Sequence, residues 1–216
     1  MAEEYTIAIL VFDQADLLDI TGPKEVFGAV RQPVESKEKD PILQIYSSVP
    51  LIHVDYVGIG SSPKITTNDG TTLMVDRHLD EILSTERPYD VIVIPGGKGV
   101  HDIKTNEKIQ RWVGSQVGAH HLLISVCTGA YVLAEAGLLT GMKVTTHQRH
   151  HDLFEQLYPK IMIDRQAIYC EMENIITTAG VTSGIDGAIR VVERLFGETQ
   201  AKQVSTILNY SVRQYS

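Results

Sequence analysis

The chain has few cysteines, and this scarcity limits the kinds of protein it can be. Only Cys127 and Cys170 occur among its 216 residues. Two cysteines are too few for the disulfide framework of a small secreted domain, and they suit a reducing compartment. We therefore expect two thiols and a cytoplasmic protein.

An excess of positive charge is also missing. The formal net charge is −8 at pH 7, and no stripe of lysine and arginine offsets it. A negative surface repels phosphate groups, so we expect neither nucleic acid nor a membrane as a partner. No apolar run approaches the ~20 residues of a membrane span. The N-terminus lacks the basic region of a secretory signal.

The overall composition is that of an ordinary globular protein. Hydrophobic residues make up 43% of the chain and charged residues 21%, which is close to the average balance. No linker, repeat or low-complexity tract divides the sequence. We therefore predict a single domain over residues 1–216.

Three apolar runs predict strands that are buried on both faces, as the strands of parallel sheets are. They are residues 6–12 (TIAILVF), 90–95 (DVIVIP) and 122–126 (LLISV). Further strands are predicted at residues 42–48, 143–146, 167–171 and 174–178, with a hairpin over 65–75 that turns at Asn68, Asp69 and Gly70. Helices are predicted at residues 25–30, 106–118, 128–136 and 151–157, with two closing helices from 184 onward.

This alternation of strands and helices indicates an α/β fold with an open, mostly parallel, flavodoxin-like sheet between layers of helices. In such sheets the ligand crevice lies beyond the carboxyl ends of the strands. Three segments follow apolar strands and should meet there: 16–23 (DLLDITGP), 96–99 (GGKG) and the residues from Cys127. In the first of these, Gly22 and Pro23 predict a turn before a helix.

Cys127 stands where a strand is predicted to turn into a helix, in the sequence ISVCTGA. That arrangement is a nucleophile elbow. The positive end of the helix should lower the thiol pKa and make the thiolate reactive near neutral pH. A buried structural cysteine is the alternative, and we expect Cys170 to be one.

Asp19 and two glycines are the other candidates at this edge. Asp19 lies in an otherwise apolar stretch, so it is either a helix cap or a proton donor whose pKa is raised by desolvation. Gly96 and Gly97 offer unhindered backbone amides for an oxyanion, or else form only a tight turn.

The histidines carry less information. His147, His150 and His151 have helical spacing, with His120 and His121 upstream. Zinc needs several converging ligands with supporting contacts, so a surface helix carrying histidines explains them more simply. We expect no metal and no cofactor.

Five segments together resemble the ThiJ/PfpI superfamily, in its order and spacing and over nearly the whole chain. They are DLLDITGP, VIVIPGGKGV, SVCTGAYVLAEAGLL, KVTTH and TTAGVTSGIDGAIRVVERLFG. The combination of DITGP, CTG and TSGID most resembles the isocyanide hydratases and the sensory domains of AraC-type regulators. The resemblance implies a class I glutamine amidotransferase-like domain and a homodimer.

The resemblance also implies roles for single residues. Cys127 would be the nucleophile, the carboxyl of Asp19 would bond its sulfur, and the amides of Gly97 and Thr128 would bind the oxyanion. PfpI-type proteases place a histidine after the nucleophile. This chain has Thr128 there, so a peptidase is not expected.

Two further positions would shape the pocket. We assign Gly96 and His147 to substrate binding, since His147 matches a histidine found near the nucleophile in several branches of the superfamily. Gln148 stands where hydratases often have tryptophan, which changes the pocket.

The implied function is conversion of an isocyanide, a small molecule, into an N-substituted formamide through a thioimidate on Cys127. A glyoxalase or deglycase acting on methylglyoxal-type carbonyls is an alternative, as is a non-catalytic sensor or stress protein. AraC-type regulators carry a helix-turn-helix region after this domain, and the sequence stops at Ser216 without one.

Overall fold

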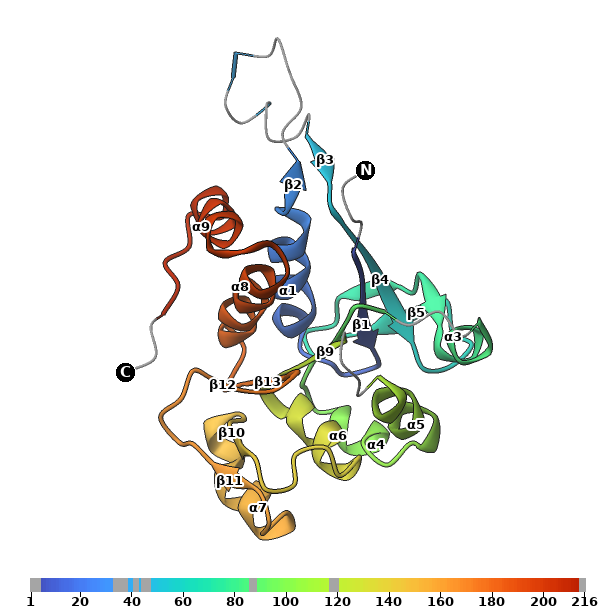
Figure 1. The fold of residues 1–216 in the computed structure, drawn as a ribbon. Coiled ribbons are helices and arrows are strands. Elements are labelled where there is room, and N and C mark those ends of the chain that lie inside the picture. Colours follow the sequence, from blue (N-terminus) through green and yellow to red (C-terminus); the bar gives the residue numbers. More distant parts are fainter. Residues whose placement is uncertain are drawn as a thin grey trace.

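A central sheet of seven strands organises the protein (Figure 1). The computed structural model describes residues 5–32, 39–40, 43, 48–85, 89–116 and 121–213. Along the sheet the strands are β12 (Tyr169–Met172), β13 (Ile175–Thr178), β9 (Leu122–Val126), β8 (Val91–Ile94), β1 (Tyr5–Val11), β4 (Ile52–Gly58) and β7 (Arg77–His78). Within this sheet the β12–β13 pair is antiparallel and the other described pairs are parallel. The predicted flavodoxin-like α/β fold is confirmed.

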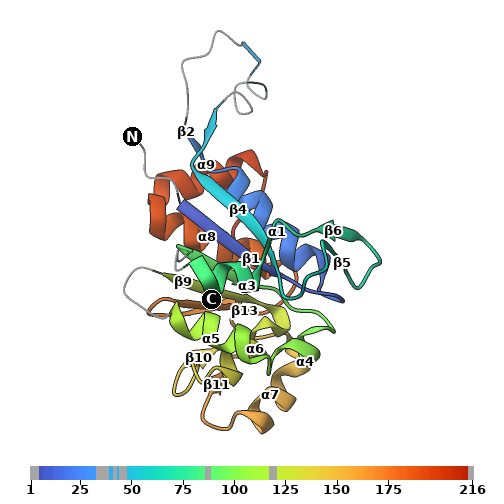
Figure 2. The ribbon, with the colours of Figure 1, turned by 90° about the vertical axis from the view of Figure 1, so that its right-hand side faces the viewer.

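Helices cover both faces of this sheet. They are α1 (Leu17–Gly28), α3 (Leu79–Thr85), α4 (Val100–Ile103), α5 (Glu107–Ser115), α6 (Ala130–Glu135), α7 (His151–Leu157), α8 (Ser183–Phe196) and α9 (Glu198–Ile207). Figures 1 and 2 place α1, α8 and α9 on one face and α3, α5 and α6 on the other. The remaining elements are the 3₁₀ turns η1 (Cys127–Gly129) and η2 (Gln148–His150), and the strand pairs β2 (Arg31–Gln32) with β3 (Val49–Pro50), β5 (Lys64–Thr66) with β6 (Thr72–Met74), and β10 (Lys143–Val144) with β11 (Met162–Ile163).

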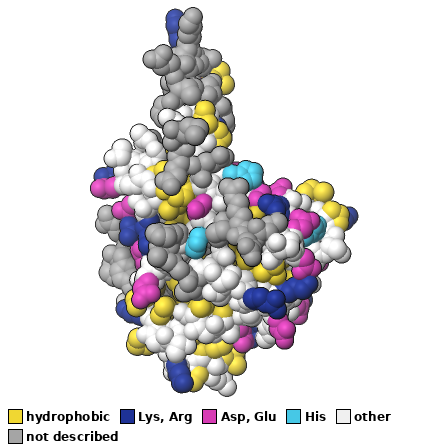
Figure 3. All heavy atoms as spheres, turned by 45° about the vertical axis from the view of Figure 1, so that its right-hand side comes forward, with side chains coloured by type: hydrophobic (Ala, Val, Ile, Leu, Met, Phe, Trp, Pro, Cys, Tyr) yellow, Lys and Arg dark blue, Asp and Glu magenta, His cyan; other side chains and the backbone are white. Residues whose placement is uncertain are grey.

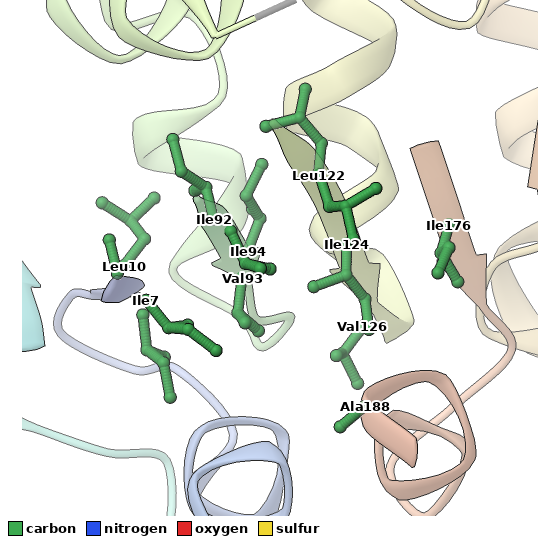
Figure 4. Close-up of a cluster of buried hydrophobic side chains, with 14 of the residues drawn as sticks. Ile7, Leu10, Ile92, Val93, Ile94, Leu122, Ile124, Val126, Ile176 and Ala188 are labelled. Atoms are coloured by element: carbon green, nitrogen blue, oxygen red, sulfur yellow. The ribbon is translucent and has the colours of Figure 1, made fainter. Parts of the chain in front are cut away.

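The hydrophobic core extends over both faces of the sheet, and one part of it lies where α8 packs on the carboxyl half of β9. Figure 4 shows Val126 pointing toward Ala188 of α8. Two glycines make this approach possible, because an added Cβ at Gly187 would lie 2.8 Å from Ile124 and one at Gly184 would lie 2.9 Å from Val126. The start of α8 is therefore held against β9, the strand that leads into Cys127.

Helix α1 corrects the prediction of a turn at residues 16–23. The helix runs from Leu17 to Gly28, with Pro23 inside it, although an internal proline removes a backbone donor. Tertiary packing explains the difference. Both Gly22 and Pro23 are buried, and an added Cβ at Gly22 would lie only 3.2 Å from Ile185 of α8. Asp19 consequently lies in the first turn of a helix.

Strand β4 was not predicted, although it pairs with β1 in parallel along its full length. Its apolar pattern is interrupted by His53 and Asp55, and the buried Asp55 accepts a 2.7 Å hydrogen bond from Tyr89 Oη. The strand predicted at residues 42–48 falls almost entirely outside the described residues, as do the last residues of the helix predicted at 106–118. The predicted hairpin is confirmed by the antiparallel pair β5–β6.

Charges of both signs share the visible surface. On the face drawn in Figure 3, lysine and arginine side chains lie among aspartates and glutamates, and the described part of that face shows no continuous basic strip. Of the helices described, none combines the length and the apolar character needed to cross a membrane.

Candidate active site

The turn predicted at Cys127 is present. Cys127 follows β9 directly and begins η1 with a backbone φ of +56°, which is the left-handed region that non-glycine residues seldom adopt. Gly129 is required two residues later, because a Cβ there would lie 2.1 Å from the carbonyl oxygen of Ile94. The Cys127 side chain is only 4% exposed.

A buried threonine and histidine brace this strained turn. The Thr146 hydroxyl donates a 2.7 Å hydrogen bond to the carbonyl oxygen of Cys127. The carbonyl oxygen of Thr146 in turn lies 2.9 Å from Nε2 of His151. The prediction that His151 belongs to a surface set was wrong, since the residue is 4% exposed. The KVTTH segment was among those that carry the family resemblance. Nothing in the sequence, however, indicated that Thr146 contacts Cys127.

Asp19 is fully buried beside the elbow. Its Oδ2 accepts a 2.9 Å hydrogen bond from the backbone N–H of Gly96, and no described group bonds its Oδ1. Burial raises the pKa of Asp19 to about 8, an effect that the Gly96 bond reduces and the charge of Asp16 increases. The helix cap position belongs to Asp16. Asp19 therefore keeps a proton at neutral pH.

The thiol of Cys127 differs from the prediction. Burial raises its pKa, the nearby Asp19 carboxyl raises it further, and the backbone N–H of Thr128 only partly lowers it. The expected low-pKa thiolate was wrong because lost hydration outweighs the helix end, which here is the short η1 and a six-residue α6. At rest the site thus holds a neutral thiol beside a neutral carboxyl.

The glycine loop closes over this pair. An added Cβ at Gly96 would lie 2.7 Å from Thr128 N and 2.9 Å from Asp19 Oδ2. Gly97 has a φ of +122°, and its N–H donates a 3.0 Å hydrogen bond to Thr128 Oγ1. The structure therefore brings Asp19, Gly96, Gly97 and Thr128 together around Cys127. Their catalytic roles remain predictions.

His147 lies further along the same edge. Its Nδ1 accepts a 3.3 Å hydrogen bond from Arg149 N, its ring packs against that of His150, and its Cδ2 would lie 3.5 Å from a Cβ at Gly180. These contacts place it beside the loop after β13. Its part in substrate binding stays a prediction.

Asp16 is a third acidic group at the site, and sequence analysis did not single it out. Asp16, Asp19 and Cys127 offer atoms that all lie within 4.8 Å of one another, and they are the one such group of possible metal ligands within the described ranges. A metal would have to displace the protons that Asp19 and Cys127 hold. This donor set therefore does not favour a metal.

Comparison with known proteins identifies the family. Residues 5–194 match the family model described as the DJ-1/PfpI family. The chain is 32% identical over 206 residues to an isonitrile hydratase of Pseudomonas putida, a match that covers 95% of this chain and 78% of that one.

Solved structures agree on the fold. The structure of Drosophila melanogaster DJ-1beta matches with a TM-score of 0.79 at 18% identity and covers 96% of this chain and 99% of that chain. An AraC family transcriptional regulator from Pseudomonas putida matches with a TM-score of 0.73 at 16% identity and covers 94% of this chain and 99% of that chain. The family model matches residues 5–194, and this chain therefore belongs to the DJ-1/PfpI family.

Proposed function

We propose that this chain hydrates an isocyanide to an N-substituted formamide. The observation that carries the proposal is the pairing of a thiol on a strained elbow with a buried carboxyl that keeps its proton up to about pH 8. The terminal carbon of an isocyanide must receive a nucleophile and a proton on the same atom, and this pair offers both. The 32% identity to an isonitrile hydratase supports the same reaction.

The first half of the reaction is an addition. Sγ of Cys127 bonds to the terminal carbon of R–N≡C, while Asp19 gives its proton to that carbon and takes the thiol proton in return. The product is a thioimidate, R–N=CH–S–Cys127. The net change moves the thiol proton to carbon and leaves Asp19 protonated.

Backbone amides stabilise the adduct. The N–H of Thr128 already faces the sulfur, and the N–H of Gly97 becomes available once the Thr128 hydroxyl turns away from it. Gly96 leaves room beside them, because it has no side chain between Asp19 and Thr128. Water then adds to the thioimidate carbon, and cleavage of the C–S bond releases R–NH–CHO.

Two alternatives use the same fold. One is a glyoxalase or deglycase, because a thiol beside a carboxyl also suits addition to a methylglyoxal-type carbonyl. The chain is 26% identical over 163 residues to the Parkinson disease protein 7 homolog of Danio rerio. A non-catalytic sensor is the other alternative, because an AraC family transcriptional regulator shares the fold.

A parallel assay separates these functions. The purified chain is incubated with an aryl isocyanide and, separately, with methylglyoxal, and formamide and lactate are measured. We expect formamide without lactate, and no product from Cys127→Ala. Lactate alone would support the glyoxalase, and the absence of both products would contradict both enzyme functions.

We further propose that the protein acts as a homodimer, as the family resemblance implies. Light scattering at micromolar concentration should give twice the mass of the 23.9 kDa chain. A monomer would contradict this.

A further inference from the structure

Asp16 lies beside the Cys127–Asp19 pair, yet the addition step gives it no task. Its carboxylate, the carboxyl of Asp19 and the sulfur of Cys127 approach one another within 4.8 Å. Asp19 and Cys127 are buried, whereas Asp16 is partly exposed. Asp16 is therefore the member of the trio that solvent water reaches.

The side chain of Asp16 does not do what its position in the helix predicts. Asp16 is the N-cap residue of α1, but it makes no capping hydrogen bond. An aspartate in this position usually accepts one from the first turn, which stabilises the helix. Instead, Oδ1 of Asp16 accepts a 2.6 Å hydrogen bond from Nδ2 of Asn68. A local stabilising bond that is given up in this way is typical of a functional position.

The hairpin that carries Asn68 is itself fixed to the loop before α1. The N–H of Asn68 donates to the carbonyl oxygen of Ala15 at 3.0 Å, and the N–H of Gln14 donates to that of Thr66 at 2.7 Å. Oδ1 of Asp13 accepts from the N–H of Thr66 at 2.8 Å. The hairpin thus holds the Asp16 carboxylate in one orientation next to the site.

The second half of the proposed reaction needs a base. Water attacking the thioimidate must give up a proton, and general base catalysis is the usual means. Asp19 cannot accept it, because the addition step leaves Asp19 protonated. Cys127 is occupied by the adduct. Of the three acid–base groups gathered here, only Asp16 remains.

We infer that Asp16 is the general base that activates water against the thioimidate, an inference that rests on the proposed hydration. Asp16 takes a proton from water as the water oxygen bonds to the imidate carbon, and Asp19 protonates the nitrogen. The intermediate is R–NH–CH(OH)–S–Cys127. When the C–S bond breaks, the hydroxyl proton returns to Asp19 and the proton on Asp16 passes to the sulfur. The products are R–NH–CHO and the resting thiol.

Asp16→Asn tests this role. Asparagine keeps the size of the side chain and an oxygen for Asn68 but cannot take a proton from water. We expect Cys127 to be modified by an aryl isocyanide at nearly the wild-type rate, while formamide release falls by at least ~10²-fold. Intact-protein mass spectrometry should then detect the chain plus one isocyanide, and the double variant Asp16→Asn with Cys127→Ala should show no adduct.

Asp13→Asn is the matched control. It removes one charge from the same loop and keeps an acceptor for Thr66, so turnover should be that of wild type without an adduct. Asn68→Ala tests positioning: we expect a lower kcat with an unchanged KM and a smaller accumulation of adduct.

Three results would count against the role. Wild-type turnover by Asp16→Asn without an adduct overturns the role of Asp16 and leaves the hydration proposal intact. Loss of adduct formation together with turnover overturns it too, because Asp16 would then act in the addition. If the wild-type chain forms no formamide, the hydration proposal fails and this inference fails with it.

Discussion

Two aspartates occupy matching places in neighbouring helices and have opposite surroundings. Asp19 lies in the first turn of α1 and Asp186 in the first turn of α8, and both are fully buried. Asp186 accepts hydrogen bonds from the backbone N–H and Nε of Arg213, each at 3.0 Å, and from Tyr210 Oη at 3.1 Å. Asp19 accepts one, from Gly96.

The difference shows that partners, more than burial, decide what a buried carboxyl can do. The oxygens of Asp186 are taken up by an ion pair with Arg213 and by further donors, which fix its side chain in place. A carboxyl with a single donor and no cation keeps its proton and can transfer it. Asp186 is thus suited to fixing the C-terminal segment onto α8, and Asp19 to chemistry.

The sharpest test of this contrast is Asp19→Asn. It removes the transferable proton, so turnover should fall by at least ~10²-fold, the low end of what positioned acid catalysis supplies. Asp186→Asn, in the matching place, should keep the wild-type rate. Because the acid form is needed, wild-type turnover should hold below the Asp19 pKa of about 8 and decline above it. Unchanged turnover in Asp19→Asn would remove Asp19 from the mechanism.

Substitutions around Asp186 should lower the stability of the fold and leave turnover unchanged. Arg213→Ala leaves a buried carboxylate without its cation, and we expect a loss of about 3 kcal/mol in the free energy of unfolding, measured with urea. Asp186→Asn should cost less, about 1 kcal/mol, because the Arg213 side chain it leaves behind is 42% exposed and water can solvate it. Equal losses in the two variants would contradict this assignment.

The reactivity of the Cys127 thiol tests the surroundings of Asp19. Since the pKa of Cys127 is raised, its alkylation by iodoacetamide should accelerate ~10-fold for each pH unit from neutral into alkaline pH. In Asp19→Asn the alkylation rate should exceed the wild-type rate above pH ~8, where the wild-type Asp19 carboxylate is charged and holds the thiol pKa up. The measurement uses a Cys170→Ser background. A rate that levels off near pH 7 would indicate the low-pKa thiolate instead.

The smallest effect concerns stability and pH. The pKa of Asp19 is raised from 3.8 to about 8 in the fold, so its stabilising contribution is complete below 3.8 and is lost as pH rises through 8. Between pH 7 and 9 the wild-type chain should lose about 1 kcal/mol relative to Asp19→Asn, or ~3 °C in melting temperature. Parallel melting curves for the two proteins would contradict the raised pKa.

Much of the fold followed from local sequence patterns. The apolar runs of β8 and β9 and the Asn68-Asp69-Gly70 turn predicted their elements, because burial on two faces and a tight turn each leave a short-range signature. Helix α1 did not follow, because its passage through Pro23 depends on the fit of Gly22 against Ile185. That contact joins segments far apart in the chain.

Part of the candidate site could likewise be predicted from the sequence, and part of it could not. The elbow at Cys127 could be predicted, since strand, cysteine and glycine are adjacent in the sequence. The raised pKa of its thiol could not, because hydration and the charge of Asp19 depend on the folded surroundings. The support from Thr146 and the diverted side chain of Asp16 are likewise long-range contacts. Neither leaves a pattern in the local sequence.

The strained backbone at Cys127 has a consequence for protein engineering. A non-glycine residue at a φ of +56° costs of order 1–3 kcal/mol, and glycine adopts that conformation freely. Glycine at 127, asparagine at 19 and a capping side chain at 16 would each relieve a local cost and each remove a group that the proposed reaction uses. By the proposed mechanism, a library ranked by melting temperature alone would enrich inactive chains. Thermostable variants of this protein have to be selected for turnover and stability together.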